Sequence, residues 1–188
     1  MRVVSGKVRG LQLKTIESDS TRPTKDMVKE ALFSILMSKT PDSIFLDLFA
    51  GSGGIGIEAL SRGAEKAYFS DNNIECIKVI KDNLMKAKML EDTFVFHGDY
   101  LKMIDEIKEI KFDIIFIDPP YSKGLGIKAI ERISSYNLLK IDGILVYETD
   151  EVEDVPDTIG MYERFNYKKY GRNVLIMEKK AFIRVNNS

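Results

Sequence analysis

Residues 44 to 56 read IFLDLFAGSGGIG and lead from a short apolar segment into a glycine-rich turn. Within this stretch Gly51, Gly53 and Gly56 have the spacing G-x-G-x-x-G. Because glycine has no β-carbon, the turn can be tight and a ligand can approach its backbone closely. The apolar segment predicts a buried strand, and the residues after the turn predict a helix. A strand, a glycine turn and a helix in this order are typical of α/β folds that bind a nucleotide.

Outward from this turn, short β-rich segments alternate with longer helical segments, as in parallel strands joined by crossover helices. The predicted strands are Ile44–Leu48, Lys66–Ser70, Thr93–His97, Phe112–Ile117 and Gly143–Glu148, and the predicted helices are Ile55–Arg62, Ile74–Met89, Leu101–Glu109 and Leu125–Ser135. Two later β-rich segments, Tyr162–Tyr170 and Asn173–Lys179, are separated by Gly171 and Arg172 and predict a hairpin. We therefore expect a Rossmann-like α/β fold with a seven-stranded, mostly parallel sheet and a C-terminal antiparallel hairpin.

Residues 1–40 precede the alternating pattern and predict a small N-terminal extension. Arg2–Val4 and Leu11–Leu13 are expected to form a hairpin, followed by a helix with Thr24 as its N-cap. The apolar stripe of that helix is expected to comprise Val28, Leu32, Ile35 and Leu36. A chain of 188 residues with 44% apolar side chains can form a single domain. We expect the extension over 1–40, the α/β core over 41–180 and a tail over 181–188.

The composition argues against several classes of protein. Cys76 is the only cysteine, which excludes an internal disulfide, and no Cys/His cluster has metal-ligand spacing. The N-terminus lacks the apolar segment of a signal peptide, and no run of about 18 apolar residues could span a bilayer. We therefore expect a cytoplasmic protein with no metal and no membrane association. The net charge is −1, yet residues 1–39 hold eight basic and four acidic side chains, a local surplus that could attract phosphates.

Three aspartates follow or interrupt predicted strands where a nucleotide cofactor would bind. Asp71 ends the second strand, where a carboxylate would accept hydrogen bonds from the ribose of either NAD or S-adenosylmethionine. Asp47 lies in a buried strand, where a carboxylate would repel a pyrophosphate but attract a sulfonium and an α-ammonium group. The preferred cofactor is therefore S-adenosylmethionine. Asp99 is equally suited to accept the adenine amino group or to cap the next helix. The expected cofactor-binding residues are Asp47, Phe49, Ala50, Gly51, Ser52, Gly53, Asp71 and Asp99.

The fourth predicted strand ends in Asp118-Pro119-Pro120-Tyr121, which we interpret as the catalytic segment. Ligands of open α/β sheets bind outside the carboxyl ends of the strands, so this segment should lie beside the glycine turn. If the Asp118 side chain and the Pro119 carbonyl accept both N–H bonds of an amino group on a base, its lone pair is directed at the methyl donor. The fixed φ of Pro119 and Pro120 would hold that carbonyl in place, and Tyr121 would stack on the base. Catalysis would then consist of positioning and electrostatics.

The motifs together resemble those of the RsmD type of 16S rRNA guanine-N2 methyltransferases, and the resemblance covers nearly the whole chain. It runs through residues 2–6, 9–10, 21–24, 28–33, 46–53, 58–64 and 118–121. The resemblance implies the class I methyltransferase fold and methyl transfer from S-adenosylmethionine to N2 of one guanine in bacterial 16S rRNA, within an assembling small subunit. It further implies that Arg22 and Thr24 lie near the cleft, and that Arg2 and Arg9 of the N-terminal hairpin meet RNA.

Other functions remain compatible with these residues. Adenine or cytosine in DNA, another RNA, or a protein glutamine can be methylated with similar Asp-Pro-Pro-Tyr chemistry. The glycine turn could also serve an NAD-dependent oxidoreductase, and the protein could be an inactive RNA-binding factor. Comparison of methyl transfer to small subunits, naked rRNA and DNA distinguishes between the possible acceptors. Calorimetry with NAD and with S-adenosylmethionine distinguishes an oxidoreductase from a methyltransferase.

Overall fold

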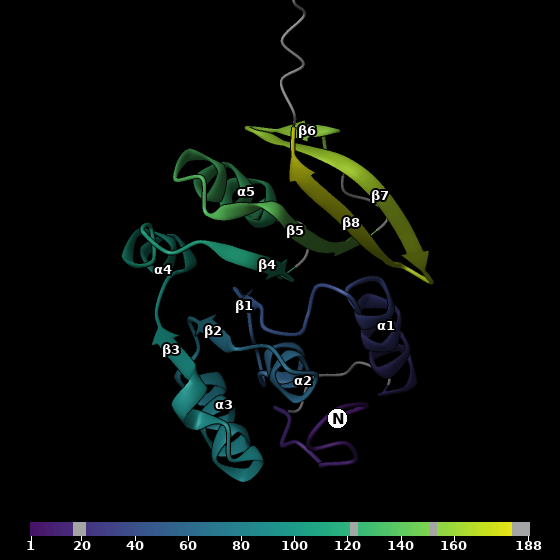
Figure 1. The fold of residues 1–188 in the computed structure, drawn as a ribbon, viewed down its shortest axis with the longest axis vertical. Helices are drawn as coiled ribbons and strands as arrows, with labels where there is room; N and C mark the ends of the chain where they lie inside the picture. The colour runs from purple at the N-terminus through teal and green to yellow at the C-terminus, as the bar shows by residue number, and fades with distance from the viewer. Residues whose placement is uncertain (17–21, 121–123, 151–153, 182–188) are drawn as a thin grey trace, which may run out of the picture.

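The computed structural model describes residues 1–16, 22–120, 124–150 and 154–181. A single α/β unit contains five α-helices and an eight-stranded sheet in this part of the chain (Figure 1). The helices are α1 (Arg22–Ile35), α2 (Gly54–Ser61), α3 (Ile74–Ala87), α4 (Tyr100–Glu106) and α5 (Leu125–Ser135), with a 3-10 turn at Leu90–Asp92. The strands are β1 (Ile44–Asp47), β2 (Lys66–Asp71), β3 (Thr93–His97), β4 (Phe112–Ile117), β5 (Leu139–Asp150), β6 (Thr158–Ile159), β7 (Tyr162–Tyr170) and β8 (Asn173–Lys180).

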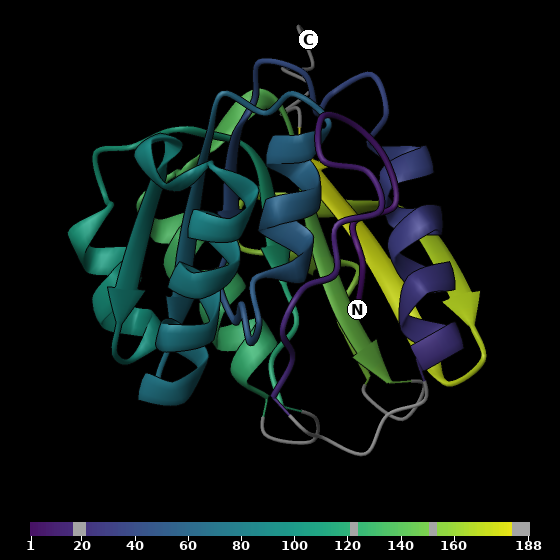
Figure 2. The same cartoon turned by 90° about the horizontal axis from the view of Figure 1, so that it is seen from below.

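The strand order in the sheet is β3-β2-β1-β4-β5-β8-β7-β6. The first five strands in this order are parallel, and β8 pairs antiparallel with both β5 and β7. The carboxyl ends of the parallel strands therefore lie at one edge of the sheet, as the arrows in Figure 2 show. The first residues of β8 lie at this same edge because that strand runs in the opposite direction.

Helices cover the sheet on both faces, in keeping with the apolar sequence of its central strands. Helices α1, α2 and α3 pack on one face around Phe45, Phe69 and Phe116, whereas α4 and α5 pack on the other around Leu46 and Ile115 (Figure 1). Alternate side chains of β8 enter the two cores, with Val174 and Ile176 on the α5 side and Leu175 and Met177 on the α1 side. This alternation agrees with the predicted hairpin.

The class of fold predicted from the sequence is confirmed, whereas the number of strands and the start of α1 differ from the prediction. The sheet has eight strands because the two-residue strand β6 pairs with the start of β7. Two residues are too few to leave a periodic signal in the sequence. Helix α1 begins at Arg22, so Thr24 is its third residue and the predicted N-cap is wrong. Pro23 is compatible with this earlier start, because an N–H in the first turn of a helix needs no partner within the helix.

The N-terminal segment forms a hairpin that is held by isolated contacts. Arg2 and Gln12 form a single antiparallel bridge, and Val3 N–H donates to the Leu11 carbonyl at 2.9 Å. The turn of this hairpin packs on the end of α2: Lys7 N–H donates to the Ser61 carbonyl at 2.7 Å. A β-carbon at Gly6 would lie 1.8 Å from that carbonyl oxygen, so this close approach requires glycine.

Candidate active site

A cavity of about 770 Å³ opens at the carboxyl edge of the sheet. Its lining extends across neighbouring strands, from Gly98 after β3 to Glu148 in β5 and Asn173 at the start of β8. The glycine turn after β1 and the segment after β4 lie between these limits. Cavities of this size at this edge are the usual ligand sites of open α/β sheets. The cavity is therefore the candidate active site.

The glycine turn between β1 and α2 is held by backbone hydrogen bonds. Ala50 N–H donates to the Ser70 carbonyl at 2.9 Å, and Gly53 N–H donates to the Ala50 carbonyl at 2.7 Å. Gly51 and Gly53 have φ angles of 54° and 78°, in the left-handed region that favours glycine. Gly56 serves packing, because a β-carbon there would lie 2.3 Å from the Phe69 ring. Phe49, Ala50, Gly51 and Ser52 line the cavity, whereas Gly53, also predicted to bind the cofactor, is the N-cap of α2 and is not among the described lining residues.

Asp47 lies at the end of β1, below this turn, and lines the cavity although it is only 2% exposed. Its Oδ2 accepts a hydrogen bond from Gly56 N–H at 3.0 Å. The pKa of Asp47 is raised to about 7, chiefly by burial and to a smaller extent by the negative charge of Asp71, while the hydrogen bond from Gly56 opposes the rise. A bound cation would oppose both effects, since it favours the ionised carboxylate. The geometry is thus suited to a positively charged ligand group.

Asp71 at the end of β2 fastens the glycine turn to the neighbouring strand. Its Oδ2 accepts from Gly51 N–H at 2.9 Å, and its Oδ1 accepts from Asn73 N–H at 2.9 Å. Cys76 lies in the first turn of α3, where burial and the adjacent Asp71 raise the pKa of its thiol to about 11. The predicted ribose contact of Asp71 stays a prediction; the carboxylate does line the cavity.

Asp99 caps helix α4, with its Oδ1 accepting from Leu101 N–H at 2.9 Å. It lines the cavity as well, so the two roles that the sequence left open are compatible with one position. The rings of Phe49 and Tyr100 lie side by side at this end of the cavity, with centroids 5.0 Å apart. They form an apolar wall of the kind that a flat heterocycle packs against.

Asp118, Pro119 and Pro120 follow β4 and line the same cavity as the glycine turn. The parallel pairing of β1 with β4 brings these two segments together, as predicted. Pro119 is buried and Pro120 is exposed, so the tandem prolines lead from the core to the surface. Tyr121, predicted to stack on the base, lies outside the described residues.

Of the four residues predicted to contact RNA, the structure describes the side chains of Arg2 and Arg9 only. Arg2 is exposed and follows Met1, which lines the cavity. Arg9 is exposed in the hairpin turn, which packs on Ser61 at the last residue of α2, whereas Gly54 and Ile55 at the first turn of that helix line the cavity. Figure 2 shows this turn beside the end of α2 that lies opposite the carboxyl edge of the sheet. Arg22 and Thr24 lie in the first turn of α1, and their side chains are outside the described part of the structure.

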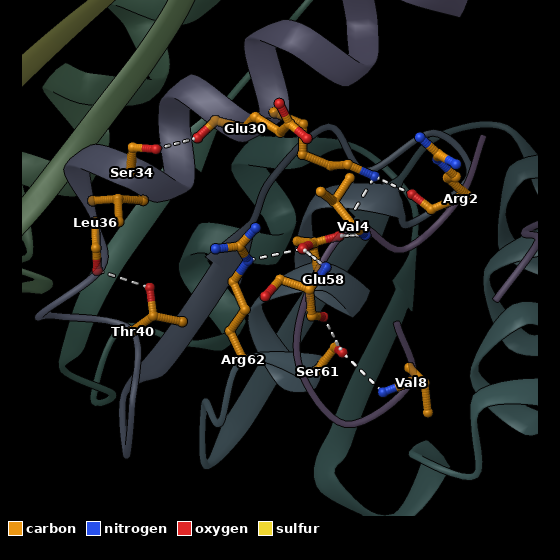
Figure 3. Close-up of polar contacts among 12 residues, drawn as sticks. Arg2, Val4, Val8, Glu30, Ser34, Leu36, Thr40, Glu58, Ser61 and Arg62 are labelled. Carbon is orange, nitrogen blue, oxygen red and sulfur yellow. Dashed lines mark hydrogen bonds and ion pairs between the residues drawn. The ribbon is translucent and has the colours of Figure 1, made fainter. Parts of the chain in front are cut away.

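A buried ionic cluster that sequence reasoning missed joins the N-terminal segment to α1 and α2. Glu58 is fully buried and accepts hydrogen bonds from Val4 N–H at 2.7 Å and Ser5 N–H at 2.9 Å (Figure 3). It also forms ion pairs with Lys29 at 3.5 Å and with Arg62 at 2.8 Å. Lys29 in turn donates to the Arg2 carbonyl and lines the cavity. A glutamate within the otherwise apolar α2 was the signal that could have revealed this cluster.

Asn83 on α3 supports the glycine turn from behind, and its role was also missed. Its side chain exchanges two hydrogen bonds with the backbone of Lys14, at 2.8 Å and 3.0 Å. The same amide donates to the Ser52 carbonyl at 2.9 Å. A fully buried asparagine therefore connects the N-terminal segment, α3 and the turn.

Two more polar residues that the sequence did not single out lie beyond the Asp118 segment. Glu148 on β5 is 8% exposed, and Asn173 on β8 donates from its side-chain amide to Glu148 Oε1 at 2.5 Å. Both line the cavity. They come together because β5 and β8 are paired, although 25 residues separate them in the sequence.

Two features are absent from the described ranges. Within them, no three His, Cys, Asp or Glu side chains are grouped so as to hold a metal ion. No helix there has the length and apolar character needed to cross a membrane.

Comparison with known proteins identifies the family. Residues 1–179 match the family model described as conserved hypothetical protein 95. The Bacillus subtilis protein YlbH is 37% identical over 182 residues, covering 96% of this chain and 99% of the relative. Ribosomal RNA small subunit methyltransferase D of Haemophilus influenzae is 36% identical over 153 residues, covering 80% of this chain and 79% of the relative. The solved structure of the Escherichia coli protein yhhF superimposes with a TM-score of 0.85 at 27% identity, covering 96% of this chain and 97% of that one. The chain therefore belongs to the family of ribosomal RNA small subunit methyltransferase D and has the class I methyltransferase fold, as its motifs predicted.

Proposed function

We propose that this protein transfers a methyl group from S-adenosylmethionine to the N2 amino group of a guanine in bacterial 16S rRNA. The observation that carries the proposal is the single cavity shared by the glycine turn and the Asp118–Pro119 segment. A donor bound at the turn and an amino group bound at Asp118 would be neighbours there. The family relatives named as ribosomal RNA small subunit methyltransferases support rRNA as the acceptor.

S-adenosylmethionine is favoured over NAD by Asp47. This buried carboxylate faces the cavity beneath the turn, where a pyrophosphate would be repelled and the sulfonium or α-ammonium group would be attracted. Asp71, Asp99 and the Phe49 ring line the part of the cavity beside β2 and β3, where the adenosine would bind. The cofactor supplies an electrophilic methyl group when bound, and the residues of the chain hold it in place.

On the acceptor side, the Asp118 carboxylate and the Pro119 carbonyl accept the two N–H bonds of the amino group. They direct its lone pair toward the methyl group, and the ionised carboxylate stabilises the positive charge that develops on the nitrogen. Arg2, which follows the cavity-lining Met1, and Arg22, in the first turn of α1, would bind RNA phosphates, and Arg9 would contact RNA only if the substrate extends along α2. The reaction would take place in the cytoplasm during assembly of the small subunit.

The test is methyl transfer from labelled cofactor to assembled small subunits, naked 16S rRNA and DNA, followed by mapping of the label. The proposal predicts label on the N2 position of one guanine in the ribosomal RNA. Label on DNA, on another base or on protein would overturn it. Calorimetry that detects binding of NAD but not of S-adenosylmethionine would favour an oxidoreductase instead.

The Asp118→Ala variant tests whether the protein is a methyltransferase or an inactive RNA-binding factor. We expect methyl transfer to fall by roughly 100-fold or more, because an oriented charge is lost at the reacting nitrogen. Cofactor affinity measured by calorimetry should change less than about threefold. RNA binding that persists with methylation unaffected would contradict the assigned role of Asp118.

A further inference from the structure

Glu148 lines the cavity at the end opposite Asp71 and Asp99, and the proposed reaction assigns no role to its carboxylate. The strand order places the glycine turn over β1, the Asp118 segment over β4, and Glu148 and Asn173 over β5 and β8. Adenosine bound beside β2 and β3 lies on one side of Asp118, so the acceptor base must occupy the other side. Glu148 and Asn173 line that side.

We propose that Glu148, oriented by Asn173, accepts the N1–H of the target base and thereby selects guanine. This inference rests on the proposed methylation of an exocyclic amino group at Asp118. It adds the residue that decides which base is accepted.

The argument uses the ring nitrogen next to the amino group of each base. In guanine the nitrogen N1 beside the 2-amino group carries a hydrogen and is a donor. In adenine the nitrogen N1 beside the 6-amino group is an acceptor, and so is N3 beside the 4-amino group of cytosine. An ionised carboxylate only accepts hydrogen bonds. Placed beside the group that binds the amino nitrogen, it pairs with guanine and opposes the lone pair of adenine or cytosine.

The burial of Glu148 raises the free-energy cost of binding a base that has no N–H donor at this position. Glu148 is 8% exposed, so a base that offers no donor leaves a desolvated carboxylate facing a lone pair. Sites built to hydrogen-bond a substrate donor reject analogues that lack it far more strongly than sites that discriminate by shape. The 2.5 Å hydrogen bond from the Asn173 amide to Oε1 fixes the orientation of the carboxylate relative to the base.

The probe is 2-aminopurine, which keeps the 2-amino group of guanine but has an unprotonated N1. Small-subunit particles are reconstituted on rRNA with guanine or 2-aminopurine at the mapped target nucleotide, and kcat/KM is measured for each. The wild-type protein should prefer guanine by about 100-fold or more. In the Glu148→Gln variant the side-chain oxygen can still accept from Asn173, which leaves its amide to donate to N1 of 2-aminopurine. The preference for guanine should therefore fall by at least about tenfold.

The control is Glu131→Gln, which removes the same charge from an exposed position on α5 and should leave the preference unchanged. The ratio of two substrates in one preparation does not depend on how much of a variant is folded. Equal rates on guanine and 2-aminopurine in the wild type, or an unchanged preference in Glu148→Gln, would overturn the role of Glu148 while leaving the proposed function standing. Failure of the wild type to methylate either particle would overturn both.

Discussion

At the scale of single residues, two aspartates with different surroundings line the part of the cavity where we propose that the cofactor binds. Asp47 is buried beneath the turn, with a pKa raised to about 7 chiefly by desolvation. Asp71 is half-buried and holds the backbone of Gly51 and Asn73. Their separate contacts lead to separate predictions.

Asp47 should make cofactor binding depend on pH. A cation binds the ionised carboxylate better, so the affinity should rise as the pH passes upward through about 7. Calorimetry with S-adenosylmethionine should give a roughly tenfold lower Kd at pH 8 than at pH 6. The Asp47→Asn variant keeps an acceptor for Gly56 N–H and should bind more weakly, with little change over this range. An equal pH dependence in both proteins would show that another group is responsible.

Asp71 should affect cofactor affinity through both its charge and its hold on the turn. Asp71→Ala removes both and should weaken binding by roughly 10-fold to 100-fold, whereas Asp71→Asn retains an acceptor for Gly51 N–H and should lose less. The turnover number of each Asp71 variant at saturating cofactor should stay within about threefold of the wild-type value. Equal losses of affinity and turnover here and in Asp118→Ala would contradict the separation of roles.

Cys76 should react slowly with alkylating reagents. With its thiol pKa raised from 9.0 to about 11, the thiolate fraction at pH 8 is about 100-fold lower than in a free cysteine. Mass spectrometry of iodoacetamide labelling should show this difference, and Asp71→Ala should speed labelling because it removes a nearby negative charge. Rapid labelling of the wild type would contradict the assigned environment.

Residues that a sequence motif marked line the cavity, whereas other lining residues are brought there by tertiary contacts that left no signal in the sequence. Asp47, Asp71, Asp99 and residues 118–120 all line the cavity. Glu148 carried no motif, since its partner Asn173 comes from a distant strand. Glu58 belongs to residues 58–64, one of the segments that carry the family resemblance. Only the packing of α2 against the N-terminal segment shows that its carboxylate accepts hydrogen bonds from that backbone.

At the scale of secondary structure, the limits of strands and helices predicted from apolar periodicity agreed better with the structure than the start of α1 predicted from an N-cap residue. Strand β4 and helix α5 match their predicted limits, because each has a strong apolar pattern bounded by polar residues. Strand β5 begins at Leu139, four residues before the predicted start, with a register irregularity opposite Phe112 and Ile114. Asp142 and Gly143 break the apolar pattern in that part of the strand, so local propensity could not predict it.

Helix α2 and the N-terminal segment should depend strongly on Glu58. Glu58→Ala leaves Lys29 buried without this carboxylate and removes the acceptor of two backbone N–H groups, so unfolding in urea should show a loss of about 3 to 5 kcal/mol. Adding Lys29→Met should recover part of the loss, because the buried cation is then absent. The exposed Glu65→Ala is the matched control and should cost less than about 0.5 kcal/mol. Additive losses in the double variant would contradict the pairing.

At the scale of the whole molecule, two buried carboxylates should make the free protein less stable as the pH rises. Asp47 and Glu178 both have pKa values raised to about 7, in each case mainly by burial. Between about pH 4 and 7 the folded state keeps protons that the unfolded chain has released, so the free energy of unfolding falls as the pH increases. Each group contributes a slope of up to about 1.4 kcal/mol per pH unit.

Urea unfolding at pH 5.5 and pH 8 tests this behaviour. The wild type should have the higher midpoint at pH 5.5, and Glu178→Gln should reduce the difference because it removes one titrating carboxylate from the interior of β8. Glu163→Gln, on the neighbouring strand but half-exposed, should leave the difference unchanged. A midpoint that rises with pH would refute the assignment.

The order of the strands also has a pharmacological consequence. Because β1, β4 and β5 are neighbours, the regions proposed to bind the methyl donor and the acceptor base are parts of one cavity. A bisubstrate compound that joins adenosine to guanine through a short tether would fill both regions as one molecule. The second half would then bind at an effective concentration in the millimolar range, so its affinity should exceed that of either fragment by about 10² to 10⁴. Inhibitors of this kind would be selective for enzymes that combine this cavity with a guanine-reading carboxylate.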